Sequence, residues 1–302
     1  MIRVASLSLL PLLVSAFLFV SCGSDKPGGG NAGAGGAQDS LDLAAAKEAK
    51  QLVKSFPSPM QLAQLLKRAG ATYNGDLLNP QNRVTNYQTT PVRSMNLGVY
   101  SADMAYANVF EQKQEALKYL SAVRRLANDL GLEGVFDKDL ENAVRRNENN
   151  QDSLVRIFSN TLADLKTRLH QNQQPQILNL MFAGGFIEGL YLALETYQDA
   201  PNPEIAQQIG EQKFNLEQLL EYTRPYKDEP EFAEVYSGLL QLQRVFAKVK
   251  ENYSGPDEQA TAQEDGVVTV GNDLKLEVTP EIIKELQNIT LPLRQQIVAE
   301  AS

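Results

Sequence analysis

The chain contains one cysteine, one histidine and no tryptophan in its 302 residues. His170 is the single histidine, so the residues needed for a histidine-based metal site, or for a Ser–His or Cys–His nucleophile pair, are largely missing. We therefore expect neither a bound metal nor another cofactor. Without tryptophan, a flat aromatic platform for sugars would have to use tyrosine alone. Chemistry based on aspartate and glutamate stays open, although no spacing of carboxylates singles out a pair.

Positive charge is also scarce. The chain has 28 lysine and arginine residues against 37 aspartate and glutamate residues, which gives a formal net charge of −9 at pH 7. An acidic surface is repelled by the phosphate backbone of nucleic acids, so we expect no nucleic-acid partner. The same charge disfavours a domain that lies flat on anionic lipid.

The start of the chain combines a positive charge with a short apolar run. Arg3 precedes residues 4–20, which are almost wholly apolar, a pattern typical of a secretory signal. A permanent membrane span needs about 20 apolar residues, so this run is marginal as one. Residues 19–23 (FVSCG) follow and resemble the lipobox of bacterial lipoproteins. The resemblance implies that residues 1–21 are a signal peptide and that Cys22 becomes the lipid-bearing N-terminus.

Cys22 is the sole cysteine, and acylation explains an otherwise unpaired thiol in an exported protein. An ordinary secretory signal with a chance cysteine is the alternative. The rest of residues 22–40 is rich in glycine and alanine, which predicts a flexible tether with a reach of about 20–25 Å. Residues 41–302 then form the predicted domain, which is long enough to bury a core.

Apolar residues recur at helical spacing through most of this domain, so we expect an all-α fold of many helices. Prolines and glycines mark the boundaries between the helices. The helices are expected over residues 41–55, 59–69, 93–110, 112–130, 137–147, 151–170, 177–197, 204–223 and 229–250.

The periodicity changes near the end of the chain. Residues 267–270 and 274–278 are rich in β-branched and alternating apolar residues and flank a Gly-Asn-Asp turn. We therefore expect a small β-hairpin over 266–278.

A terminal helix is expected over residues 280–300. Thr279 is suited to its N-cap, and Pro280 to its first position, where the missing N–H has no intrahelical partner. We expect Pro292 to break this helix in two.

Two stretches of the sequence look alike. Residues 98–106 and 184–191 each contain glycine, then an acid, then tyrosine three residues after the acid. This suggests a diverged duplication of a helical unit, with halves at 93–170 and 179–250. Chance similarity between amphipathic helices is the alternative, and superposition of the two halves decides between them.

Glu188 is the only charged residue between Leu180 and Leu194. A helix that is apolar on all sides is buried, and a buried carboxylate needs partners or a raised pKa. We expect hydroxyl or basic partners from the helix that carries the first of the similar stretches. The polar site is either part of a ligand cavity between the halves or a core network that fixes helix register. The candidate residues are Glu188, Asp103, Tyr100, Tyr106 and Tyr191.

The lipobox, residues 96–107 (NLGVYSADMAYA) and residues 184–195 (GGFIEGLYLALE) together resemble uncharacterised helical lipoproteins of Bacteroidota. This resemblance indicates kinship and implies no particular activity. Asp-Ser-Leu at Ser40 and at Ser153 also resembles the short O-glycosylation signals of that phylum.

We therefore expect a lipid-anchored protein of the bacterial cell envelope, in the outer membrane, on its periplasmic or surface face. The membrane is its partner through the N-terminal lipid. Its predicted role is non-catalytic, binding a small-molecule ligand or a partner protein. An Asp/Glu-based hydrolase of envelope material and a structural scaffold are the alternatives.

Overall fold

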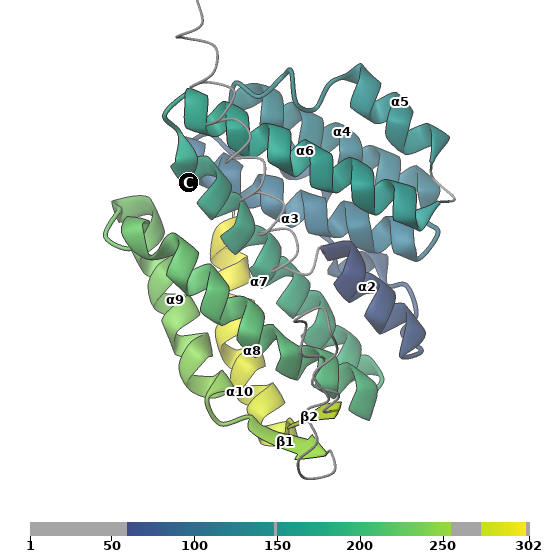
Figure 1. Cartoon of the computed structure of the whole chain (residues 1–302), viewed down its shortest axis with the longest axis vertical. Coiled ribbons are helices and arrows are strands. Elements are labelled where there is room, and N and C mark those ends of the chain that lie inside the picture. The colour runs from purple at the N-terminus through teal and green to yellow at the C-terminus, as the bar shows by residue number, and fades with distance from the viewer. Residues whose placement is uncertain (1–58, 148–149, 255–272, 300–302) are drawn as a thin grey trace, which may run out of the picture. The chain divides into compact units, whose positions relative to one another are not determined.

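A computed structural model of the chain describes residues 59–147, 150–254 and 273–299, which are drawn as ribbon in Figure 1. The predicted signal peptide, the tether and the helix expected over 41–55 lie outside these residues, and so do Cys22 and Ser40. The described residues form a mostly helical fold with a small two-stranded antiparallel sheet near the C-terminus, so the predicted all-α class is confirmed.

Most helices start at the caps and prolines that mark their starts in the sequence. Asn202 and Thr279, for example, accept hydrogen bonds from backbone N–H groups in the first turns of helices that open with proline. The α-helices are α2 (Pro59–Arg68), α3 (Thr90–Val109), α4 (Lys113–Asp129), α5 (Lys138–Arg146), α6 (Gln151–Gln171), α7 (Pro175–Asp199), α8 (Pro203–Thr223), α9 (Pro230–Phe246) and α10 (Pro280–Val298). Short 3-10 helices lie at η1 (Gly75–Leu77), η2 (Gln81–Thr85) and η3 (Arg224–Tyr226).

Helices α3 and α7 cross with their backbones almost in contact. A Cβ atom added to Gly98 would lie 2.0 Å from the carbonyl oxygen of Met181, and one added to Gly184 would lie 2.0 Å from that of Met95. The contact is reciprocal, because each glycine stands three residues after a methionine of its own helix. Glycine is required at both positions, since any side chain would force the helices apart.

The remaining helices surround this pair. Helices α2 and α4 pack against α3, while α6, α8 and α10 pack against α7, and α9 contacts both α8 and α10. Figure 1 shows α4–α6 on one side of α7 and α8–α10 on the other. Helix α7 is therefore the centre of the core.

Within the described part of the chain, α7 is the one helix that is long and apolar enough to cross a membrane, with a hydropathy of 1.6. Of its most apolar window, 78% is buried inside the domain. This composition is that of a central core helix, which is apolar on every face because it has protein on nearly every side.

The sheet differs from the predicted hairpin. Strand β2 (Asp273–Glu277) matches the expected second strand, but it pairs antiparallel with β1 (Lys250–Ser254). The expected first strand, residues 267–270, lies outside the described residues. The helix prediction over 229–250 was also too long, because α9 ends at Phe246 and the chain turns into β1.

Contacts with α8 explain the position of β2. Gln207 donates to the carbonyl of Leu274 at 3.2 Å and accepts from the N–H of Leu276 at 2.8 Å, so its side chain hydrogen-bonds the strand as a neighbouring strand would. Gly210 leaves room for this approach, since a Cβ there would lie 2.8 Å from Val278. These tertiary contacts are invisible in a local pattern of residues.

The prediction that Pro292 breaks the terminal helix was wrong. Helix α10 runs without interruption from Pro280 to Val298 with Pro292 inside it. An internal proline costs a helix about 3 kcal/mol, and here tertiary packing compensates for that cost. Leu293, the next residue, is buried against Gly238 of α9, where a Cβ would lie 2.8 Å from it.

The duplication stays a hypothesis. The first proposed half contains α3 to α6 and the second contains α7 to α9, so the second has one helix fewer. The reciprocal crossing of α3 and α7 relates the two similar stretches locally, because it places their glycines face to face. A close crossing of this kind arises between any two helices with small residues at matched positions.

Candidate functional site

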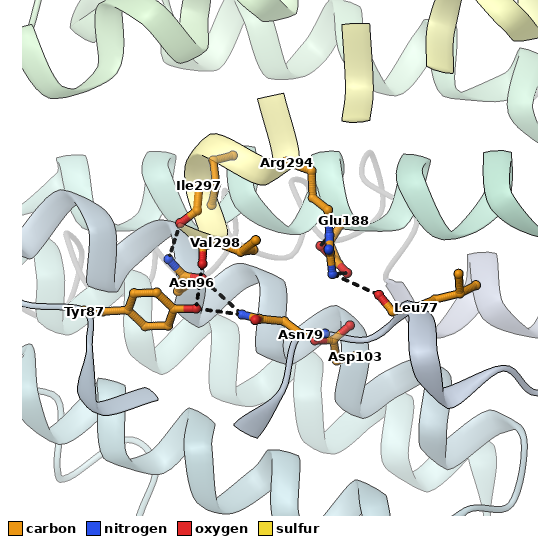
Figure 2. A network of polar contacts seen from close by, with 9 residues as sticks. All are labelled: Leu77, Asn79, Tyr87, Asn96, Asp103, Glu188, Arg294, Ile297 and Val298. Carbon is orange, nitrogen blue, oxygen red and sulfur yellow. Dashed lines mark hydrogen bonds and ion pairs between the residues drawn. The ribbon is translucent and has the colours of Figure 1, made fainter. Parts of the chain in front are cut away.

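Glu188 lies in the middle of α7 with 0% of its surface exposed. Arg294 of α10 binds its carboxylate with two nitrogens, Nε to Oε2 at 2.8 Å and Nη2 to Oε1 at 2.9 Å (Figure 2). The Nη2 atom also donates to the carbonyl of Leu77 at 2.9 Å, and the guanidinium lies 4.2 Å from the ring centroid of Tyr191. The buried charge is thus paired and hydrogen-bonded. Its basic partner comes from α10 and not from α3, where we expected it.

Asp103 of α3 is a second carboxyl with 0% exposure. Its Oδ2 accepts from the backbone N–H of Asn79 at 3.1 Å, while Oδ1 has no donor among the described residues. Burial raises the pKa of Asp103 well above its ordinary value, and the neighbouring Glu188 carboxylate raises it further, whereas Arg294 lowers it. The charged form of Asp103 is thus disfavoured in the core beside Glu188.

A chain of amide and hydroxyl groups extends this cluster toward the C-terminus. Asn79 Nδ2 donates to the Tyr87 hydroxyl at 2.9 Å and to Asn96 Oδ1 at 3.4 Å. Asn96 in turn donates to the carbonyl of Ile297 at 2.8 Å, and the Tyr87 hydroxyl donates to that of Val298 at 3.4 Å. Figure 2 shows how these contacts join the connection before α3 to the last turn of α10.

Two of the predicted tyrosines have other partners. The hydroxyl of Tyr100 donates to the carbonyl of Pro80 at 2.9 Å, and that of Tyr106 donates to the carbonyl of Thr72 at 3.3 Å. Both therefore hold the segment between α2 and α3 in place. Of the candidate residues, the structure brings together around Arg294 the side chains of Glu188, Asp103 and Tyr191.

The cluster is closed to solvent. Because Glu188 and Asp103 have no exposed surface, a substrate cannot reach either carboxyl unless the core opens. This geometry counts against a hydrolase that uses this pair. It fits a buried polar network that fixes the relative positions of α3, α7 and α10.

Sequence reasoning missed Arg294. The signal that identified Glu188 was available for it, because Arg294 is the only charged residue from Leu286 to Val298. A single charge within an apolar stretch of helix points to a buried partner of opposite sign. The amides Asn79 and Asn96 carried no comparable signal, since asparagine is common in turns and on helix surfaces.

A cavity of about 230 Å³ lies on another part of α3 and α7. Helices α2, α4, α6 and α8 also line it, and Phe136 and Leu140 contribute from the segment at α5. On α7 the lining side chains are half-buried although most of the helix is fully buried. These α7 residues are Met181, Phe182 and Phe186.

The lining is apolar and adaptable. Three of the five methionines in the chain, Met60, Met104 and Met181, contribute to it. Methionine is flexible and polarisable, and it suits surfaces that adjust to a ligand. Gly185 and Gly189 take up little space on α7 and leave the cavity wide at that helix.

The volume is large for a packing defect. Apolar cavities of about 150 Å³ already take up molecules the size of benzene. The cavity is not closed, because it opens to solvent and its lining side chains on α7 are only half-buried. Its size, its access and its apolar lining would therefore admit a small apolar molecule.

The remaining predicted residue within the structure is Ser153, in the first turn of α6. It is half-buried, and its hydroxyl accepts from Arg156 at 2.9 Å, so its O-glycosylation stays a prediction. In the described ranges, no group of three or more His, Cys, Asp or Glu side chains could hold a metal ion. Comparison with protein-family models, curated proteins and solved structures found no match to this chain.

Proposed function

We propose that this protein is a lipid-anchored protein of the bacterial envelope whose helical domain binds a small apolar molecule. The cavity between α2, α3, α6, α7 and α8 carries the proposal, because of its size and its apolar lining. The lipobox and the glycine-rich segment after Cys22 support anchoring at a membrane. A tethered domain of this kind would hold its ligand near the bilayer without being inserted in it.

Binding is tested with N-phenyl-1-naphthylamine, a neutral apolar probe that fluoresces when it leaves water. The protein is the chain from Cys22 onward, produced without its leader so that it stays free of lipid. We expect saturable binding of one probe per chain.

Ser101→Phe is the informative variant, since Ser101 lines the cavity and a phenyl ring would occupy part of it. We expect probe affinity to fall by about tenfold or more as the space is filled. Ser121→Phe is the matched control: both serines donate to the carbonyl four residues earlier, at 2.6 and 3.0 Å, but Ser121 is exposed on α4. Absence of saturable binding, or equal affinity in the two variants, would contradict the proposal.

A further inference from the structure

The chemistry of the cavity wall limits the ligand. Among the described residues that line it, none carries a charge. Its two hydroxyls can only accept from a ligand, because Ser101 and Thr161 already donate to carbonyls of their own helices at 2.6 and 2.9 Å. Polar groups with remaining capacity to donate are found on α8, at Gln212 and Asn215.

These two amides form a partly satisfied pair. They are only 6% and 8% exposed. Asn215 Nδ2 donates to Gln212 Oε1 at 2.9 Å, and Gln212 Nε2 donates to the backbone carbonyl of Gln208 at 3.1 Å. Each NH₂ group has a second hydrogen, and Asn215 Oδ1 accepts from no donor within the described part of the chain. The pair can therefore both donate to and accept from a ligand.

A second hollow of about 330 Å³ adjoins the cavity and shares Leu62, Gln212 and Asn215 with it. Gln207 and Glu211 are among its other polar residues, and no described residue of its lining is basic. The amide pair thus lies at the boundary between an apolar space and a polar one.

We propose that the ligand is an uncharged amphiphile, with an apolar body against α3 and α7 and a hydroxyl or amide head group at Gln212 and Asn215. This inference rests on the proposed function and specifies its ligand. At the amide pair, an anionic head group, such as a carboxylate or phosphate, would meet no basic residue of the described lining and would face Glu211. Lys113 and Arg145 line a separate hollow, which shares Met60 and Met104 with the cavity but neither of the two amides. An ether or ester could not bind the carboxamide oxygen of Asn215, because neither can donate a hydrogen bond.

The test is competition against bound N-phenyl-1-naphthylamine by molecules with one chain and different heads: octan-1-ol, methyl octyl ether, octanoate and octylammonium. We expect octan-1-ol to displace the probe at a concentration about tenfold lower than either ion requires. Octan-1-ol should also displace the probe at a concentration about threefold lower, or more, than methyl octyl ether requires, because only the alcohol donates a hydrogen bond. Octanoate or octylammonium as the strongest competitor would overturn the inference.

Asn215→Leu replaces the amide with an apolar group of similar size. It should lose the preference for octan-1-ol over methyl octyl ether, with both competitors measured against the probe affinity of the variant itself. Gln218→Leu, at an exposed position of the same helix, is the control and should keep that preference. A preference that survives in Asn215→Leu would also overturn the inference. If Asn215→Leu does not fold, the ranking of competitors on the wild-type protein decides alone. Failure of the probe to bind the wild-type protein would instead refute the proposed function.

Discussion

Of the two buried carboxyls, Glu188 forms an ion pair with Arg294, whereas Asp103 has no ion-pair partner among the described residues. Burial raises the pKa of Asp103 above its ordinary value, and the Glu188 carboxylate raises it further. An arrangement of this kind makes the free energy of unfolding depend on pH, because the unfolded chain releases the proton at the ordinary carboxyl pKa.

Asp103→Asn should remove this dependence. The folded pKa of Asp103 lies above its ordinary value of 3.8, so folding takes up a proton. This part of the stability is complete below about pH 4 and is lost as pH rises toward the folded pKa, by about 1.4 kcal/mol per pH unit. The asparagine amide can donate to Glu188 at every pH. The variant should therefore match the wild-type protein near pH 4.5 and exceed its stability near pH 8.

Urea unfolding followed by circular dichroism at several pH values measures this difference. Asp139→Asn, at an exposed carboxyl in the first turn of α5, is the control and should show no such trend. A gap between Asp103→Asn and the wild-type protein that is constant with pH would mean that Asp103 does not titrate in the core.

Among the individual residues of the buried polar cluster, some could be predicted from the sequence. A lone charge in an apolar helix indicates burial, and Glu188 is fully buried. Its partner could not be placed, because Arg294 follows it by 106 residues and only the docking of α10 brings the two together. The cavity was equally hidden, since half-buried Met181 and Phe182 look like ordinary core residues in a sequence.

Among the elements, the α3–α7 crossing imposes the strictest condition on side-chain size. Gly184→Ala should lower the free energy of unfolding by about 3 kcal/mol or more, because its Cβ would lie 2.0 Å from the backbone oxygen of Met95. Backbone atoms cannot rotate away, so the helices would have to separate.

The neighbouring residue provides the comparison for this crossing. A Cβ on Gly185 would lie 3.4 Å from the nearest atom, Gly98 O, which is an ordinary contact. Gly185→Ala should therefore leave stability unchanged or raise it by up to about 1 kcal/mol, since alanine favours the helix. Chemical unfolding of both variants measures the difference. Equal losses would show that the crossing is looser than the structure indicates.

Helix positions could be predicted well because apolar periodicity and proline boundaries are local features. Helix α7, for example, was expected over 177–197 and spans Pro175–Asp199. The strand pairing and the continuity of α10 could not be predicted from the sequence, since both depend on contacts with residues far away in the chain. Strand β1 has the polar sequence KENYS, and its partner β2 begins 19 residues after β1 ends.

For the whole molecule, a lipid anchor at Cys22 stays a prediction from the sequence. Cys22→Ser in a bacterium that processes lipoproteins should abolish incorporation of a labelled fatty acid, because the thiol is the expected site of attachment. Metabolic labelling with an alkyne palmitate, followed by gel detection, measures it. Ser24→Ala, two residues away, should keep the label. Labelling that persists in Cys22→Ser would refute acylation at that residue.

The dependence of the core on α10 also bears on the order in which the chain can fold. The carbonyls of Ile297 and Val298 bind groups on Asn96 and Tyr87, which precede them by 201 and 211 residues. A chain that emerges N-terminus first would bury Glu188 without its counter-charge until Arg294, 106 residues later, has followed. The native arrangement of the earlier helices therefore waits on the docking of α10.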